Sequence, residues 1–188
     1  MSATFTPTPM RISTERYQRM VTTGVLTRND QVELIEGEIL DRAPIGAKHA
    51  AATARLARLF ILAVGDTAVV SPGGPVNLGD YSEPQPDVLL LKARADDYRA
   101  KIPDTADVLL LIEVSDSTLA FDQSIKRDLY ARYGIADYWV VDVNDKRIVT
   151  YREPSAKGYG QVLEFAMNDS VSPQAFPDVK ITFGKVFG

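Results

Sequence analysis

The chain contains no cysteine and only one histidine, His49, in its 188 residues. The absence of cysteine excludes disulfides, thiolate nucleophiles and cysteine-based zinc sites. A single histidine excludes metal centres built from several histidines, and any Ser-His-Asp arrangement would have to use His49. Thiol catalysis and multi-histidine metal chemistry are therefore excluded before any motif is considered.

Long apolar segments are also missing from the sequence. No run approaches the length of a membrane span. Residues 1–11 are rich in Thr and Pro and contain no apolar core of the kind found in a secretory signal. We therefore expect a cytoplasmic protein that does not cross a membrane.

The sequence has no excess of positive charge: 21 Lys and Arg residues oppose 25 Asp and Glu, for a net charge of −4. Proteins that coat nucleic acid through bulk charge use a basic face to neutralise phosphates, so the composition counts against that class. It does not exclude a metal-dependent enzyme acting on nucleic acid. Acidic residues that hold Mg²⁺ lower the net charge themselves, and the bound ion restores positive potential locally.

The length fits a single domain, and the chain shows no repeat or interdomain linker. We expect a flexible tail at residues 1–11 and one domain at residues 12–188. The patterns predict these elements in chain order: a helix from Ser13 or Thr14 to Gly24, a hairpin over 31–41, a helix over 47–64, strands over 68–71, 76–78, 86–91 and 107–115, a helix over 121–133, strands over 138–143 and 147–152, a weaker strand over 161–165, and a loose C-terminus. One mixed sheet flanked by helices is the simplest arrangement of these elements.

Two carboxylates interrupt the apolar pattern of the central strands. Glu113 lies in an otherwise apolar strand, and Asp87 stands at the beginning of another, directly after Pro86. If these strands pair antiparallel, the two carboxylates lie at the same end of the sheet, about 5 Å apart at Cβ when directly opposite. Such close like charges repel each other unless a divalent cation lies between them.

The helix that follows Glu113 carries a lysine on its predicted inner face. Asp122, Ile125, Lys126 and Leu129 follow the spacing of one helical face, and the two apolar residues indicate that this face is turned inward. Lys126 is therefore predicted on or beside the buried stripe, with Asp122 one turn before it. The helix begins only a few residues after Glu113, so Lys126 can reach back over the end of that strand.

Asp87, Glu113 and Lys126 together suit hydrolysis of a phosphoester. Two acids can bind Mg²⁺ or Mn²⁺ and still leave room for a phosphate oxygen and an attacking water, while a lysine orients the nucleophile or stabilises the transition state. Taken singly, each residue also has a structural interpretation. Asp87 is a common turn residue, Glu113 could be half-exposed or paired with an arginine, and Lys126 could form a surface pair with Asp122. Their order and predicted topology favour the site.

Several segments together resemble a known family: VELIEGE at 32–38, SEPQPDV at 82–88, LIEVSDST at 111–118, Asp122 with Lys126, and GIADYWVVD at 134–142. From about Tyr17 to about Arg152 the chain is similar to the Uma2-type family of candidate restriction endonucleases, a branch of the PD-(D/E)XK superfamily whose members cut DNA with Mg²⁺. The resemblance implies an α/β, restriction-endonuclease-like fold with a mixed central sheet flanked by helices, after an N-terminal helix and hairpin. It also implies that Asp87 is the motif aspartate and Glu113 the second acid, with the carbonyl of Val114 as a further metal ligand.

One position departs from the superfamily pattern. The lysine usually follows the second acid by two positions, where this chain has Ser115, so Lys126 would supply the amine from the helix. Two further residues are secondary candidates. The resemblance implies a role for Glu33, as an outer metal ligand or an orienting group, against the alternative of an exposed strand acid. His49 could contact a phosphate at a helix N-terminus, although a structural hydrogen bond is the favoured interpretation.

These observations leave three functions open. The first is a Mg²⁺-dependent endonuclease that hydrolyses DNA with a metal-activated water. The second is a non-catalytic regulatory or binding protein with a nuclease fold, in which the site is incomplete. The third is hydrolysis of a smaller phosphoester, which the lack of an obvious basic stripe keeps open. A homodimer would suit double-strand cutting, but no residue pattern demonstrates one.

Overall fold

The computed structural model describes residues 8–27 and 29–188. The part of the predicted tail that falls on residues 1–7 lies outside the described residues. By their contacts the described residues form two compact units. One comprises the chain up to Arg42 together with Asn77–Pro84, and the other comprises Ala43–Val76 and Gln85–Gly188.

The first unit contains one helix and one hairpin. Helix α1 (Thr14–Thr22) begins after Ser13, whose hydroxyl accepts the Arg16 N–H and satisfies a free donor of the first turn. Strands β1 (Val32–Ile35) and β2 (Glu38–Asp41) pair antiparallel, as predicted. Their turn has positive φ at both Glu36 and Gly37, and a Cβ on Gly37 would lie 2.7 Å from Arg11 Cβ, so glycine is required there.

The segment Asn77–Pro84 belongs to this first unit and lies along the hairpin. Glu83 forms an isolated antiparallel bridge with Leu34, and the Gly37 N–H donates to the Tyr81 carbonyl at 2.7 Å. The strand predicted over 76–78 does not form. Val76 belongs to the second unit and Asn77 and Leu78 to the first, and in the described chain no strand includes these residues.

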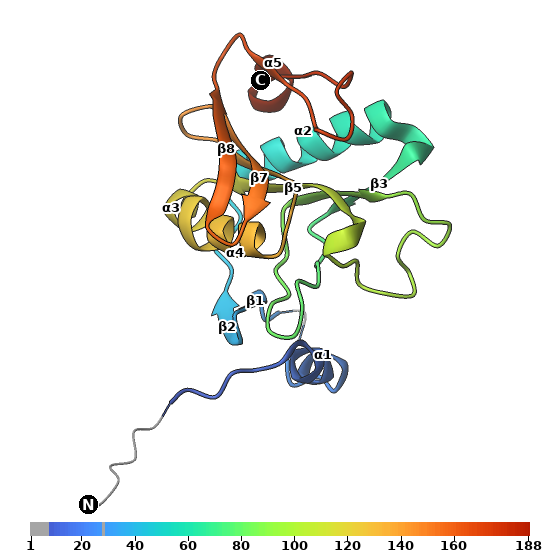
Figure 1. Cartoon of the computed structure of the whole chain (residues 1–188), viewed down its shortest axis with the longest axis vertical. Coiled ribbons are helices and arrows are strands. Elements are labelled where there is room, and N and C mark those ends of the chain that lie inside the picture. Colours follow the sequence, from blue (N-terminus) through green and yellow to red (C-terminus); the bar gives the residue numbers. More distant parts are fainter. Residues whose placement is uncertain (1–7, 28) are drawn as a thin grey trace, which may run out of the picture. The chain divides into compact units, whose positions relative to one another are not determined.

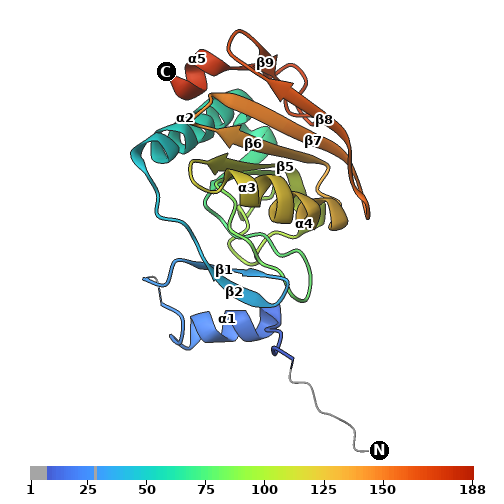
Figure 2. The same cartoon turned by 90° about the vertical axis from the view of Figure 1, so that its left-hand side faces the viewer.

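The second unit is built on a six-stranded sheet in the order β3-β4-β5-β6-β7-β8. The strands are β3 (Ala68–Pro72), β4 (Val88–Lys92), β5 (Val108–Ser115), β6 (Asp137–Asp142), β7 (Arg147–Ser155) and β8 (Gly158–Phe165). Only β5 and β6 pair parallel, so the sheet is mixed, as expected. A parallel pair needs a crossover, and the helical segment after β5 supplies it (Figure 2).

Helix α2 (Ala47–Val64) has the predicted bounds and covers one face of this sheet (Figure 1). Its buried stripe packs on side chains from alternate positions of the central strands. The resulting core includes Ala52, Leu56, Phe60, Val64, Val88, Leu90, Leu110, Ile112, Val114, Trp139 and Val141. Strand alternation therefore turns Glu113 and Ser115 toward the opposite face of the sheet. Short 3₁₀ turns η1 (Gly65–Thr67) and η2 (Thr105–Asp107) precede β3 and β5.

The opposite face carries the helix predicted over 121–133, which is divided into three parts. Helix α3 (Leu119–Phe121) leads into a π-helical turn η3 (Asp122–Lys126), and α4 (Arg127–Arg132) completes it before Gly134. Tyrosines fill the layer between this segment and the sheet, where the Tyr130 and Tyr138 rings meet edge to face with centroids 4.9 Å apart.

The end of the chain is more ordered than predicted. Strands β9 (Ser170–Val171) and β10 (Ile181–Thr182) pair, and α5 (Phe183–Phe187) follows them. Phe183 and Val186 join the core beneath α2, which explains why this short, weakly patterned segment is fixed. In the described part of the chain, no helix has the length and hydropathy that a membrane crossing requires.

Candidate active site

Asp87 and Glu113 stand at the same end of two antiparallel strands. Val88 of β4 pairs with Ile112 of β5, so Asp87, one residue before, stands level with Glu113, one residue after. Both residues are buried, with 7% of Asp87 and 3% of Glu113 exposed. The Val114 N–H donates to Asp87 Oδ2 at 2.7 Å and fixes that carboxylate. The predicted juxtaposition of the two acids is therefore present.

Two side chains from the helical segment reach Glu113. Lys126 Nζ lies 3.0 Å from Glu113 Oε1, and the Tyr130 hydroxyl donates to the same oxygen at 2.6 Å. Lys126 is only 6% exposed, so the alternative of a surface pair with Asp122 is wrong. Tyr130 was not among the residues predicted from the sequence, although its spacing of four residues from Lys126 places the two on one helical face.

The π-helical turn explains how Lys126 comes to point inward. A π turn contains an extra residue relative to an α-helical turn and changes which side chains share a face. Asp122, Lys126 and Leu129 are buried, whereas Ile125 is 49% exposed. The prediction that Ile125 marks the inner face is therefore wrong, because it assumed regular α-helical spacing through residues that form a π turn.

Asp122 lies beside this pair and has its own donors. Its Oδ2 accepts the Ser115 hydroxyl at 2.7 Å and the Thr118 hydroxyl at 2.6 Å. Burial raises the pKa of Asp122, the positive charge of Lys126 opposes that rise, and the charge of Asp87 adds a smaller rise. Ser115 therefore anchors the Asp122 carboxylate, and Lys126 provides the amine beside Glu113.

His49 joins the site from the other face of the sheet. It lies in the first turn of α2, and its Nε2 is 3.1 Å from Asp87 Oδ2. Asp87 is thus held by a backbone N–H from β5 and by an imidazole from α2. The favoured interpretation of His49 as a hydrogen-bonding residue agrees with this contact to Asp87.

Glu33 belongs to the first unit, whereas the six other candidate residues belong to the second. It sits in β1 and is only 4% exposed, so the alternative of an exposed strand acid is wrong. Glu83 of the same unit is another buried carboxylate. It accepts from the Gln18 amide, and burial raises its pKa to about 7. The sequence around Glu83 does not predict its burial, because the burial results from the tertiary bridge between Glu83 and Leu34 of β1.

The chemistry of the donor set suits a hard divalent cation. Within residues 8–27 and 29–188, no group of three or more His, Asp and Glu side chains is arranged to hold a metal ion. Mg²⁺ needs fewer, because it is commonly held by one or two carboxylates together with waters and substrate phosphate. The carbonyl and N–H of a strand residue point the same way, so the Val114 carbonyl faces the Asp87 side of β5. Asp87, Glu113 and this carbonyl form a fitting set of oxygens.

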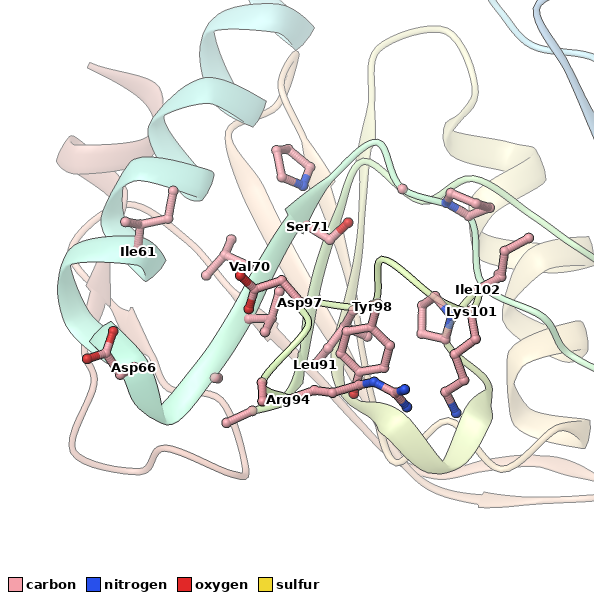
Figure 3. A pocket seen from close by; sticks show the side chains of 18 of the residues that line it. Ile61, Asp66, Val70, Ser71, Leu91, Arg94, Asp97, Tyr98, Lys101 and Ile102 are labelled. Atoms are coloured by element: carbon pink, nitrogen blue, oxygen red, sulfur yellow. The ribbon is translucent and has the colours of Figure 1, made fainter.

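A separate cavity of about 940 Å³ lies along β3 and the connection after β4 (Figure 3). None of the candidate site residues lines it. Its two cations are neutralised locally, because Arg94 pairs with Asp96 and Lys101 Nζ lies 2.7 Å from Asp107 Oδ2. The candidate active site is therefore distinct from this cavity.

Comparisons with known proteins give a family match and a structural likeness. A family model described as "Uma2: Putative restriction endonuclease" matches residues 14–184. The chain is also similar to a crystal structure described as "a putative nuclease belonging to DUF820" from Anabaena variabilis. The TM-score is 0.73, with 16% identity over 94% of this chain and 97% of that chain. At that identity the likeness concerns the fold, and it confirms the expected mixed α/β class. The comparison with curated proteins found no match.

Proposed function

The chain belongs to the Uma2 family, and from that premise we propose that it is a metal-dependent endonuclease that hydrolyses DNA phosphodiester bonds at Asp87 and Glu113. The observation that carries the proposal is the position of these two buried carboxylates, level with each other at one end of the paired strands β4 and β5. Burying two such acids side by side is costly unless a cation or donors compensate their charge. The family assignment supports a nuclease, and the metal and the catalysis are our proposal.

Asp87, Glu113 and the Val114 carbonyl would hold Mg²⁺ or Mn²⁺. The bound ion would lower the pKa of a water and offset the charge that develops on the phosphate. The Val114 N–H and His49 hold the Asp87 carboxylate in one orientation. A ligand that is already fixed loses little freedom when it binds, so both contacts support a preorganised site.

Lys126 supplies the positive charge of the proposed mechanism. Its ammonium group is buried beside Glu113, where the low dielectric strengthens its interaction with an anionic substrate. We propose that it hydrogen-bonds the attacking water or a non-bridging phosphate oxygen. Tyr130 and Asp122 are positioning residues, because Tyr130 shares the Glu113 oxygen with Lys126, and Asp122 lowers the cost of burying the lysine.

One observation favours a second function, that of a non-catalytic protein with a nuclease fold. Glu113 already has two strong donors in Lys126 and Tyr130, and an arrangement satisfied in this way is stable without an ion. In that case the pair would be structural, and the protein would bind its partner without cutting it.

Nicking of a supercoiled plasmid separates the two functions. Wild type, Asp87→Asn and Glu113→Gln are assayed with Mg²⁺, with Mn²⁺ and with EDTA. Asp66→Asn serves as the control, because Asp66 is an exposed carboxylate outside the site. We expect nicking by wild type and by the control only when metal is present, and a loss of at least about a hundredfold in both site variants. Metal-independent nicking, or equal activity in all four proteins, would reject the proposal.

A further inference from the structure

Five cations of the second unit line two adjoining hollows of its surface. Lys48, Arg55 and Arg58 lie on α2, Lys146 lies in the turn between β6 and β7, and Lys185 lies in α5. They line two hollows of about 440 and 420 Å³, and Arg55 lines both, so the hollows adjoin. Neither hollow is lined by an aspartate or a glutamate. We call these five residues the basic track.

The charges of the basic track are not neutralised by carboxylates. Lys48 Nζ donates to the Asn144 amide oxygen at 3.1 Å, and Arg55 Nη1 donates to the Val186 carbonyl at 3.2 Å. Both acceptors are neutral. Across the part of the chain that the structure describes, no ion pair involves any of the five cations.

Elsewhere in the second unit several cations are paired with acids, as Arg94 is with Asp96 and Arg147 is with Asp145 and Glu164. The chain as a whole has a net charge of −4. A stretch of unpaired cations on an acidic protein is the electrostatic footprint expected of a site for a polyanion.

Three cations of the basic track form a stripe along α2, and the N-terminal turn of this helix also carries His49 of the candidate site. Lys48, Arg55 and Arg58 are spaced i, i+7 and i+10, so they form a stripe beside the buried face of α2 that is about 15 Å long. Lys48 directly precedes His49, whose Nε2 contacts Asp87. Phosphates of one strand are spaced about 3.4 Å along a duplex, so the stripe spans about four of them.

We propose that the basic track binds the sugar–phosphate backbone of a DNA duplex and aligns it with the candidate active site. The inference rests on the proposed function only for the nature of the substrate. Acids lie close to the start of the track, because Asn144, which accepts from Lys48, also donates to Asp116 and to Asp142. Phosphate contacts are therefore expected along the other cations of the track rather than at Asn144.

Binding without cleavage tests the proposal directly. The full chain is titrated into a short fluorescein-labelled DNA duplex in EDTA, and anisotropy is followed at several NaCl concentrations. The test variant combines Lys48→Gln, Arg58→Gln and Lys185→Gln, and it keeps Arg55 because that residue holds α5 through Val186. The control combines Lys92→Gln, Arg99→Gln and Lys157→Gln, which removes the same charge from exposed positions outside the track.

We expect the test variant to lose at least about tenfold in affinity at low salt, with a salt slope shallower by about 2 to 3, since each phosphate contact contributes about 0.9. The control should stay within about twofold of wild type, and circular dichroism should show that both variants are folded. Equal affinity of the test and control variants would overturn the proposal. So would an absence of duplex binding by wild type, or preferential binding to phosphatidylserine vesicles.

Failure of this proposal is distinguishable from failure of the proposed function. The basic track includes no metal ligand, so the test variant should bind Mn²⁺ as wild type does in calorimetry. Track-dependent binding of DNA by a protein that never nicks would support the basic track and reject the nuclease. Nicking by wild type, together with unchanged duplex affinity in the test variant, would support the nuclease and reject the basic track.

Discussion

Lys126 Nζ lies 3.0 Å from Glu113 Oε1, and neither side chain is more than 7% exposed. The pair joins the sheet to the helical segment on its surface, at the end of β5 where Asp87 also stands. Breaking a buried ion pair leaves one charge without compensation, which costs far more than the pair contributes when intact. The same contact is therefore both a structural element and the centre of the proposed chemistry, and the two roles make different predictions.

Removal of the lysine alone should destabilise the fold. Lys126→Met removes the cation that lies 3.0 Å from the buried Glu113 carboxylate, and we expect the free energy of unfolding to fall by about 3 to 5 kcal/mol. Urea denaturation in EDTA measures this change. The double variant Lys126→Met with Glu113→Gln removes both charges and should recover most of the loss. A loss below about 1 kcal/mol in the single variant would show that the pair is not buried as described.

Removal of the Tyr130 hydroxyl should leave the protein folded but reduce its nicking activity. Tyr130→Phe deletes one hydrogen bond to Glu113 and should cost about 1.5 to 3 kcal/mol, with the fold retained. The matched control is Tyr159→Phe, which deletes a hydroxyl that donates to the Ile135 carbonyl. Nicking should fall in Tyr130→Phe well beyond its fall in the control. Similar activities in the two variants would remove Tyr130 from the positioning residues.

Some of these residues could be predicted from the sequence and others could not. The helix over 47–64 and the strand that carries Glu113 follow simple periodicity, because α2 has one buried stripe and β5 is buried on both faces. Ile125 was assigned to the wrong face because a π turn has no signature in apolar spacing. Tyr130 was missed because its importance depends on which oxygen it reaches. The basic track was missed because its cations come from segments far apart in the chain.

Glu83 should give the first unit a characteristic pH dependence. Burial raises its pKa from 4.5 to about 7, so the folded protein holds this proton more tightly than the unfolded chain does. As pH rises from about 4.5 to about 7, the unfolded chain loses the proton first, and the free energy of unfolding should fall by about 3 kcal/mol at most. Glu83→Gln should remove this component of the profile.

The control for that profile is Glu38→Gln, which changes an exposed glutamate of β2 in the same unit. Urea denaturation of wild type and both variants across this pH range gives the comparison. Wild type and Glu83→Gln should diverge, with the wild type losing more stability as pH rises, while Glu38→Gln follows wild type. Parallel profiles for wild type and Glu83→Gln would mean that Glu83 is solvated in the folded protein.

The central claim is that Asp87 and Glu113 together form a metal site, and calorimetric titration with Mn²⁺ tests it most directly. Wild type and the exposed control Asp66→Asn should bind the ion with the same affinity and with heat well above that of dilution. Asp87→Asn and Glu113→Gln should each lose that binding while circular dichroism shows them folded. Binding that survives both substitutions, or no binding by wild type, would contradict the account and leave the Lys126–Glu113 pair as a structural contact.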